Sequence, residues 1–167
     1  MRVKDITLIG TLAILAAMVS FVEIIITPIV PIPGMRLGLS NVVLLVALIH
    51  MPVSKAMLVA ALKSVLVAIF SGSPTSFIYS FPSGLAAILL MSLAMKMVPR
   101  ISYVGVSVIG AFINNLVQVF TSYLVLSSFV YFYYLPYITL VGTLMGTLIG
   151  FIINELERKD VLHRFFV

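Results

Sequence analysis

Apolar residues fill this chain in six long blocks, separated by short stretches rich in proline, serine or charged residues. A helix that spans the roughly 30 Å hydrocarbon core of a bilayer needs about 20 predominantly apolar residues. The blocks therefore predict six transmembrane helices at about 6–27, 37–51, 53–70, 77–98, 102–127 and 130–154, with a charged tail at 155–167. Since no polar linker divides the chain, we expect one all-α membrane domain over residues 1–167, a six-helix bundle.

The first block also has one feature of a secretory signal peptide, because Arg2 and Lys4 precede its apolar residues. It is longer than the apolar core of a typical signal, and five further blocks follow it. We therefore interpret it as a transmembrane helix that the protein retains.

The basic residues predict how the helices are oriented. With six helices, Arg36 falls on one side of the membrane and Lys63 falls inside a helix. The other eight basic residues all fall on the opposite side: Arg2, Lys4, Lys55, Lys96, Arg100, Arg158, Lys159 and Arg164. Because Lys and Arg are enriched in cytoplasmic loops, we expect a multi-pass protein of the cell membrane with both termini in the cytoplasm.

Composition supports a lipid-exposed protein. Of the 167 residues, 62% are hydrophobic and 9% are charged, whereas soluble domains have about a quarter of their residues charged. The net charge of +5 does not indicate nucleic-acid binding, because the basic residues are scattered singly rather than gathered in a stripe. The absence of cysteine excludes disulfides and thiolate metal sites.

Polar side chains inside the predicted helices are the candidates for function, since such groups are costly in hydrocarbon. Lys63 lies about 12 Å deeper than Lys55, near the middle of the bilayer. The polar side chains within the helices, together with Arg36 of the first loop, predict a pocket that is open to the outside and covered by residues 28–36 and 71–76. The predicted lining is Glu23, Arg36, Asn41, Lys63, Asn114, Asn115 and Gln118. The alternative is structural: Lys63 pairs with Glu23, and the amides only join helices.

Small residues at four-residue spacing predict close helix contacts. Gly142, Gly146 and Gly150 fall on one helix face, where another backbone can approach. Ala13 and Ala17 repeat this spacing in the first helix, either for packing within the chain or for docking a partner.

Catalytic chemistry is poorly represented. Of the five acidic residues only Glu23 falls within the predicted membrane region, so paired carboxylates are not available there. The chain has no P-loop for ATP hydrolysis, and His50 and His163 both fall on the cytoplasmic side. We therefore expect a binding protein rather than an enzyme, with no cofactor and no metal.

Several segments together resemble the Gx transporter family, which is also labelled heptaprenyl diphosphate synthase component I. They are residues 33–41 (Pro-Gly-Met-Arg-Leu-Gly-Leu-Ser-Asn), Lys63 with 70–73 (Phe-Ser-Gly-Ser), 105–111 (Gly-Val-Ser-Val-Ile-Gly-Ala) continuing to Asn115 and Gln118, and 134–136 (Tyr-Leu-Pro). The resemblance covers almost the whole chain.

That family is similar to the substrate-binding S components of energy-coupling factor (ECF) importers. The resemblance implies a six-helix protein that captures a vitamin-like or anionic amphipathic solute outside the cell. It also implies a transmembrane coupling subunit and two ATPase subunits as partners, with Ala13 and Ala17 on the docking face.

Two other functions stay open. The chain lacks the aspartate-rich motifs that hold magnesium and diphosphate in prenyl elongation, but it could be a noncatalytic partner that handles a prenyl diphosphate or quinone precursor. It could also be a subunit of a membrane flavin or quinone electron-transfer system.

Overall fold

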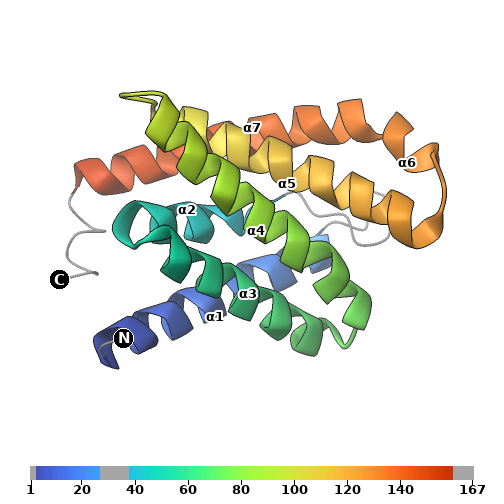
Figure 1. Cartoon of the computed structure of the whole chain (residues 1–167), viewed down its shortest axis with the longest axis horizontal. Helices are drawn as coiled ribbons and strands as arrows, with labels where there is room; N and C mark the ends of the chain where they lie inside the picture. The colour runs from blue at the N-terminus through green and yellow to red at the C-terminus, as the bar shows by residue number, and fades with distance from the viewer. Residues whose placement is uncertain (1–2, 27–37, 160–167) are drawn as a thin grey trace.

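The computed structural model describes residues 3–26 and 38–159, which form helices joined by short turns, with no strand in these ranges (Figure 1). The prediction of an all-α membrane bundle is confirmed. The helices are α1 (Val3–Ile26), α2 (Asn41–His50), α3 (Val53–Ser71), α4 (Pro74–Met97), α5 (Tyr103–Leu126), α6 (Val130–Tyr133) and α7 (Leu135–Arg158).

Five of these helices are long and apolar enough to cross a membrane: α1, α3, α4, α5 and α7. They contain 19 to 24 residues, which corresponds to about 29–36 Å at 1.5 Å per residue. The lipid-facing sides of these helices carry exposed Leu, Ile, Val and Phe side chains, as a bilayer solvent allows.

The predicted second span, 37–51, differs from the observed helix. Helix α2 has ten residues and is about 15 Å long, half the thickness of the hydrocarbon core. A turn at its start uses the preceding residues: the N–H of Asn41 donates to the carbonyl of Gly38 at 2.9 Å, and Gly38 has a φ of +86°. Pro52 ends the helix and begins α3.

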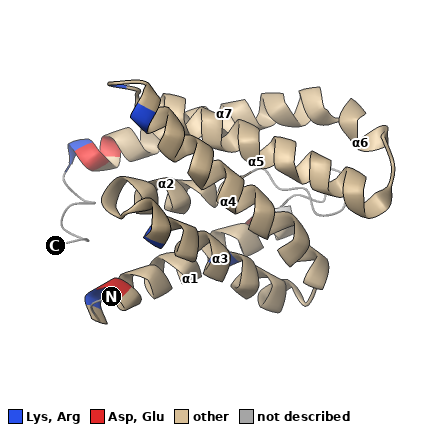
Figure 2. Cartoon of the chain, in the orientation of Figure 1, with Lys and Arg blue, Asp and Glu red and all other residues tan. Residues whose placement is uncertain are grey.

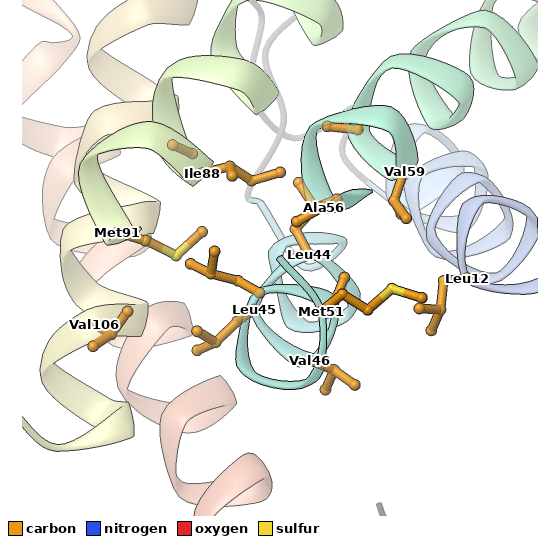
Figure 3. Close-up of a cluster of buried hydrophobic side chains, with 14 of the residues drawn as sticks. Leu12, Leu44, Leu45, Val46, Met51, Ala56, Val59, Ile88, Met91 and Val106 are labelled. Carbon is orange, nitrogen blue, oxygen red and sulfur yellow. The ribbon is translucent and has the colours of Figure 1, made fainter. Parts of the chain in front are cut away.

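Helix α2 is surrounded by other helices rather than by lipid. Leu44, Leu45 and Ala47 are fully buried, and α2 contacts α1, α3, α4, α5 and α7. Figure 3 shows Leu44 and Leu45 between side chains of several neighbouring helices, including Met91 and Val59. The apolar block at 37–51 therefore encodes a short helix in the core of the bundle.

The predicted sixth span, 130–154, is two helices. The four-residue α6 precedes Tyr134, and α7 begins at Leu135 and continues to Arg158, four residues into the predicted tail. Pro136 lies in the first turn of α7, where the missing N–H of proline costs no helical hydrogen bond. It therefore starts a helix instead of kinking one.

The three spaced glycines of α7 all face α5. A Cβ on Gly146 would lie 3.0 Å from Val108 Cα, and one on Gly150 would collide with the backbone of Val104. A Cβ on Gly142 would collide with the amide of Asn115. The glycines thus allow α5 and α7 to pack at backbone contact.

Ala13 and Ala17 lie inside the bundle. They are 1% and 0% exposed, and Ala13 belongs to the main hydrophobic core. This placement fits the alternative of packing within the chain, and docking of a partner on Ala13 and Ala17 stays a prediction. Their small side chains let the neighbouring helices approach α1 closely.

Most of the described charged residues lie at one end of the bundle, as Figure 2 shows. Lys55 at the start of α3 pairs with Asp5 of α1 at 2.9 Å, and His50 at the end of α2 meets Glu157 of α7 at 3.1 Å. Helices α1 and α3 therefore start, and α2 and α7 end, on the same face. Although α2 is short, it returns the chain to the face where α1 began.

Candidate functional site

The buried polar residues converge on the first turn of α2, residues 38–41. Glu23 of α1 is fully buried, and its Oε1 accepts hydrogen bonds from the backbone N–H groups of Gly38 and, at 3.4 Å, Leu39. A carboxylate at this position also complements the positive end of the helix dipole. Glu23 thereby fixes where α2 begins within the bundle.

Lys63 approaches the same turn from α3. Its side chain is 4% exposed, and Nζ donates a hydrogen bond to Oγ of Ser40 at 2.5 Å. One positive and one negative group therefore contact the start of α2. A buried charge is much less costly when an opposite charge and hydrogen bonds accompany it.

Two amides lie beside Gly38. The Nδ2 atoms of Asn41 and Asn114 lie 3.1 Å and 3.5 Å from the position that a Cβ on Gly38 would occupy. Asn41 is 2% exposed, and within the described residues neither its Oδ1 nor its Nδ2 has a hydrogen-bond partner. Gly38 therefore serves twice: it adopts the left-handed conformation, and it leaves room for both amides.

We call this group the α2-start site: Glu23, Gly38, Ser40, Asn41, Lys63 and Asn114. It combines four of the seven residues that the sequence predicted as pocket lining. Arg36, and with it the predicted cover at 28–36, lies outside the described residues.

The other two predicted lining residues lie elsewhere on α5. Asn115 donates from Nδ2 to the carbonyl of Ile138 in α7 at 3.0 Å, so it faces α7 and joins two helices. Gln118 is buried one turn beyond Asn114. The position of Asn115 therefore agrees with the alternative interpretation, in which an amide joins two helices.

Residues 71–76 form a local turn at the far end of α3. The Oγ of Ser71 donates to Oγ of Ser76 at 3.0 Å. Gly72 and Pro74 line an open apolar groove of about 590 Å³ between α3 and α4, and no residue of the α2-start site lines this groove.

Sequence reasoning missed Gly38 and Ser40, although both lie in the 33–41 segment that carried the family resemblance. It also missed Ser20, which is fully buried, lies one turn from Glu23 on α1, and has no partner for its Oγ among residues 3–26 and 38–159. Small residues gave no signal by themselves, because serine and glycine occur throughout the predicted helices.

A family model described as heptaprenyl diphosphate synthase component I matches residues 12–156. The chain belongs to this family. The heptaprenyl diphosphate synthase component I match includes all of α2 to α6 and every residue of the α2-start site, and it confirms the resemblance found in the sequence. No curated protein and no solved structure matches the chain. The family description names one component of an assembly, which implies a partner.

Proposed function

We propose that this protein is the solute-binding S component of an ECF-type importer, and that the α2-start site holds the polar part of a small solute. The observation that carries the proposal is the Asn41 amide, which is buried and has no hydrogen-bond partner for either polar atom in the part of the chain that the structure describes. Buried polar groups without partners are few in native proteins, and a bound molecule is one established reason for them.

The position of the site supports this function. Helix α2 is about 15 Å long and ends at the charged face, so its start is about halfway through the hydrocarbon core. Helices that begin or end near the middle of the bilayer frame the solute sites of many transporters. Five long apolar helices hold this half-length helix in place.

Each residue has a proposed role. Glu23 and Lys63 hold the start of α2 and set the local field, while Asn41 and Asn114 hydrogen-bond to polar edges of the solute. None of these roles makes or breaks a covalent bond, so we propose no enzymatic activity. We propose that the solute enters from the extracellular side past Arg36. A transmembrane coupling subunit and two ATPase subunits are the proposed partners.

The family description favours a second function: a noncatalytic membrane partner that handles a prenyl diphosphate or quinone precursor. The apolar groove between α3 and α4 suits a hydrocarbon chain as well as it suits lipid. No comparable observation distinguishes the flavin or quinone electron-transfer alternative.

Native mass spectrometry of the full chain, co-expressed with candidate partners, tests the proposal. The S-component function predicts a one-to-one complex with a small solute and an assembly containing a coupling subunit and two ATPases. Recovery with a prenyl synthase and no solute would establish the second function instead, and a bound flavoprotein would establish the third.

A further inference from the structure

We infer that the solute of the α2-start site presents a neutral lactam or imide edge, a ring N–H beside a ring C=O, to the side chain of Asn41. The inference rests on the proposed function, because it names the chemical class that the same site takes. It starts from the two unpaired atoms of Asn41, an acceptor and a donor in one plane.

Charged groups satisfy only half of this amide. A carboxylate or phosphate accepts a hydrogen bond from Nδ2 but leaves Oδ1 facing another acceptor. An ammonium group donates to Oδ1 and leaves Nδ2 unpaired. The described part of the site already contains one carboxylate, Glu23, and one ammonium, Lys63, both at the first turn of α2. These two charges offset one another, so the described part of the site attracts neither kind of ion, and a neutral group suits it better.

Backbone donors do not favour an anion either. The N–H groups of Asn41, Val42 and Val43 donate to carbonyls of the turn itself, and those of Gly38 and Leu39 donate to Glu23. The start of α2 has thus already used most of its donors on the protein. Among the described residues of this turn, the open hydrogen-bonding capacity is that of the Asn41 side-chain amide.

A neutral polyol such as a sugar fits the site less well than a flat lactam ring. A sugar would bring several hydroxyl groups, each needing a partner. The helix that leads away from the site is apolar, with Leu44 and Leu45 fully buried. A flat lactam ring concentrates its polar atoms on one edge and buries two apolar faces. The amide of Asn114, which lies on α5 beside Gly38, is placed to contact a second polar atom of such a ring.

The test is isothermal titration calorimetry on the full chain in detergent with three lactam or imide compounds of increasing molecular size: 2-piperidone, thymine and lumazine. We expect at least one to bind, and its fully N-methylated derivative (N-methyl-2-piperidone, 1,3-dimethylthymine or 1,3-dimethyllumazine), which has no ring N–H donor, to bind at least about tenfold more weakly. Benzoate, an anion of similar size, should bind more weakly than that lactam. Failure of all three lactams, equal binding of the N-methylated derivative, or tighter binding of benzoate would overturn the inference.

Variants assign the effect to Asn41. Asn41→Leu removes both polar atoms, and Asn41→Asp keeps the size but replaces the donor with an acceptor; each should weaken lactam binding about tenfold or more. Ser107→Ala is the control, since it also removes a buried polar group that has no partner in the described part of the chain. Ser107 lies two turns before Asn114, so this variant should leave binding unchanged. If a buried water alone occupies the site, both Asn41 variants will bind the lactam like the parent, and the inference is wrong.

Uptake measurements separate this inference from the proposed function. Energy-dependent uptake of a solute that has no lactam or imide edge would overturn only the inference. Lactam binding that depends on Asn41, without a coupling subunit or uptake, would overturn the importer and keep the ligand class.

Discussion

Lys63 carries its charge about 12 Å along α3 from Lys55, which pairs with Asp5 at the charged end of the bundle. The side chain of Lys63 is 4% exposed, and its ammonium donates to the hydroxyl of Ser40. A lysine at this depth is costly, so its retention requires either a structural or a binding role.

The substitution Lys63→Met distinguishes these roles. Methionine keeps the length and apolar character of the side chain but removes the charge at the start of α2. If the site binds solute, we expect solute binding to fall at least about tenfold while the protein remains monodisperse. The charged hydrogen bond to Ser40, which contributes about 1.5–3 kcal/mol, would no longer hold the start of α2 where the solute binds. Solute retained after purification, measured by mass spectrometry, together with size-exclusion chromatography, gives both readouts.

Lys55→Met is the control for this variant, since it removes the same charge from the same helix. The Lys55–Asp5 pair is a quarter exposed on each side, so its loss should change stability by no more than about 1 kcal/mol and leave binding unaltered. Aggregation of Lys63→Met alone would assign Lys63 to the structural role.

The sequence predicted Glu23, Asn41, Lys63 and Asn114 because a polar residue within an apolar block is conspicuous and expensive. It could not predict that Glu23 meets the backbone of Gly38, because that contact depends on a left-handed turn 15 residues away. It also gave no reason to separate Asn114 from Asn115, although the two neighbours face α2 and α7 respectively.

Among the helices, hydropathy predicted the five long spans but did not distinguish the short α2 from a span. Five long blocks became long helices near their predicted positions, because about 20 apolar residues suit a spanning helix and little else. The 15 residues at 37–51 suit both a short span and a core helix, and periodicity cannot separate two fully apolar alternatives. The turn at Gly38 and the five helices that surround α2 identify it as a core helix rather than a short span.

Contact between α5 and α7 depends on the glycines of α7. We expect Gly150→Ala to destabilise the protein by about 1–3 kcal/mol, because the added methyl group collides with the backbone of Val104 and one helix must shift. Thermal unfolding in detergent, followed by circular dichroism of the helical signal, measures the change. Gly146→Ala should act in the same direction, since its Cβ would lie 3.1 Å from the carbonyl of Ser107.

Gly10→Ala in α1 is the matched control, because no described atom outside the local backbone of α1 lies within 4 Å of the added Cβ. Alanine is the better helix former by about 1 kcal/mol in water, so this variant should be neutral or slightly stabilising. Equal destabilisation by Gly10→Ala and Gly150→Ala would show that the α5–α7 contact is not what the α7 glycines provide.

For the whole molecule, orientation follows from charge and from the path of the chain. The described basic residues outside α3's interior all lie at the charged end: Lys4, Lys55, Lys96, Arg100, Arg158 and Lys159. Helix α4 ends at this face and α5 leaves it, so Ser127 at the end of α5 lies about 36 Å away at the other end. The excess of Lys and Arg predicts that the charged end is cytoplasmic.

Single cysteines test this orientation without background, because the chain has none of its own. Met97 is 70% exposed at the charged end, and Ser127 is exposed at the opposite end. A membrane-impermeant maleimide should label Ser127→Cys in intact cells and Met97→Cys only after permeabilisation. The reverse pattern would invert the protein and place the start of α2 on the wrong side for an importer, whereas labelling of both from outside would contradict the separation of the two ends by the bilayer.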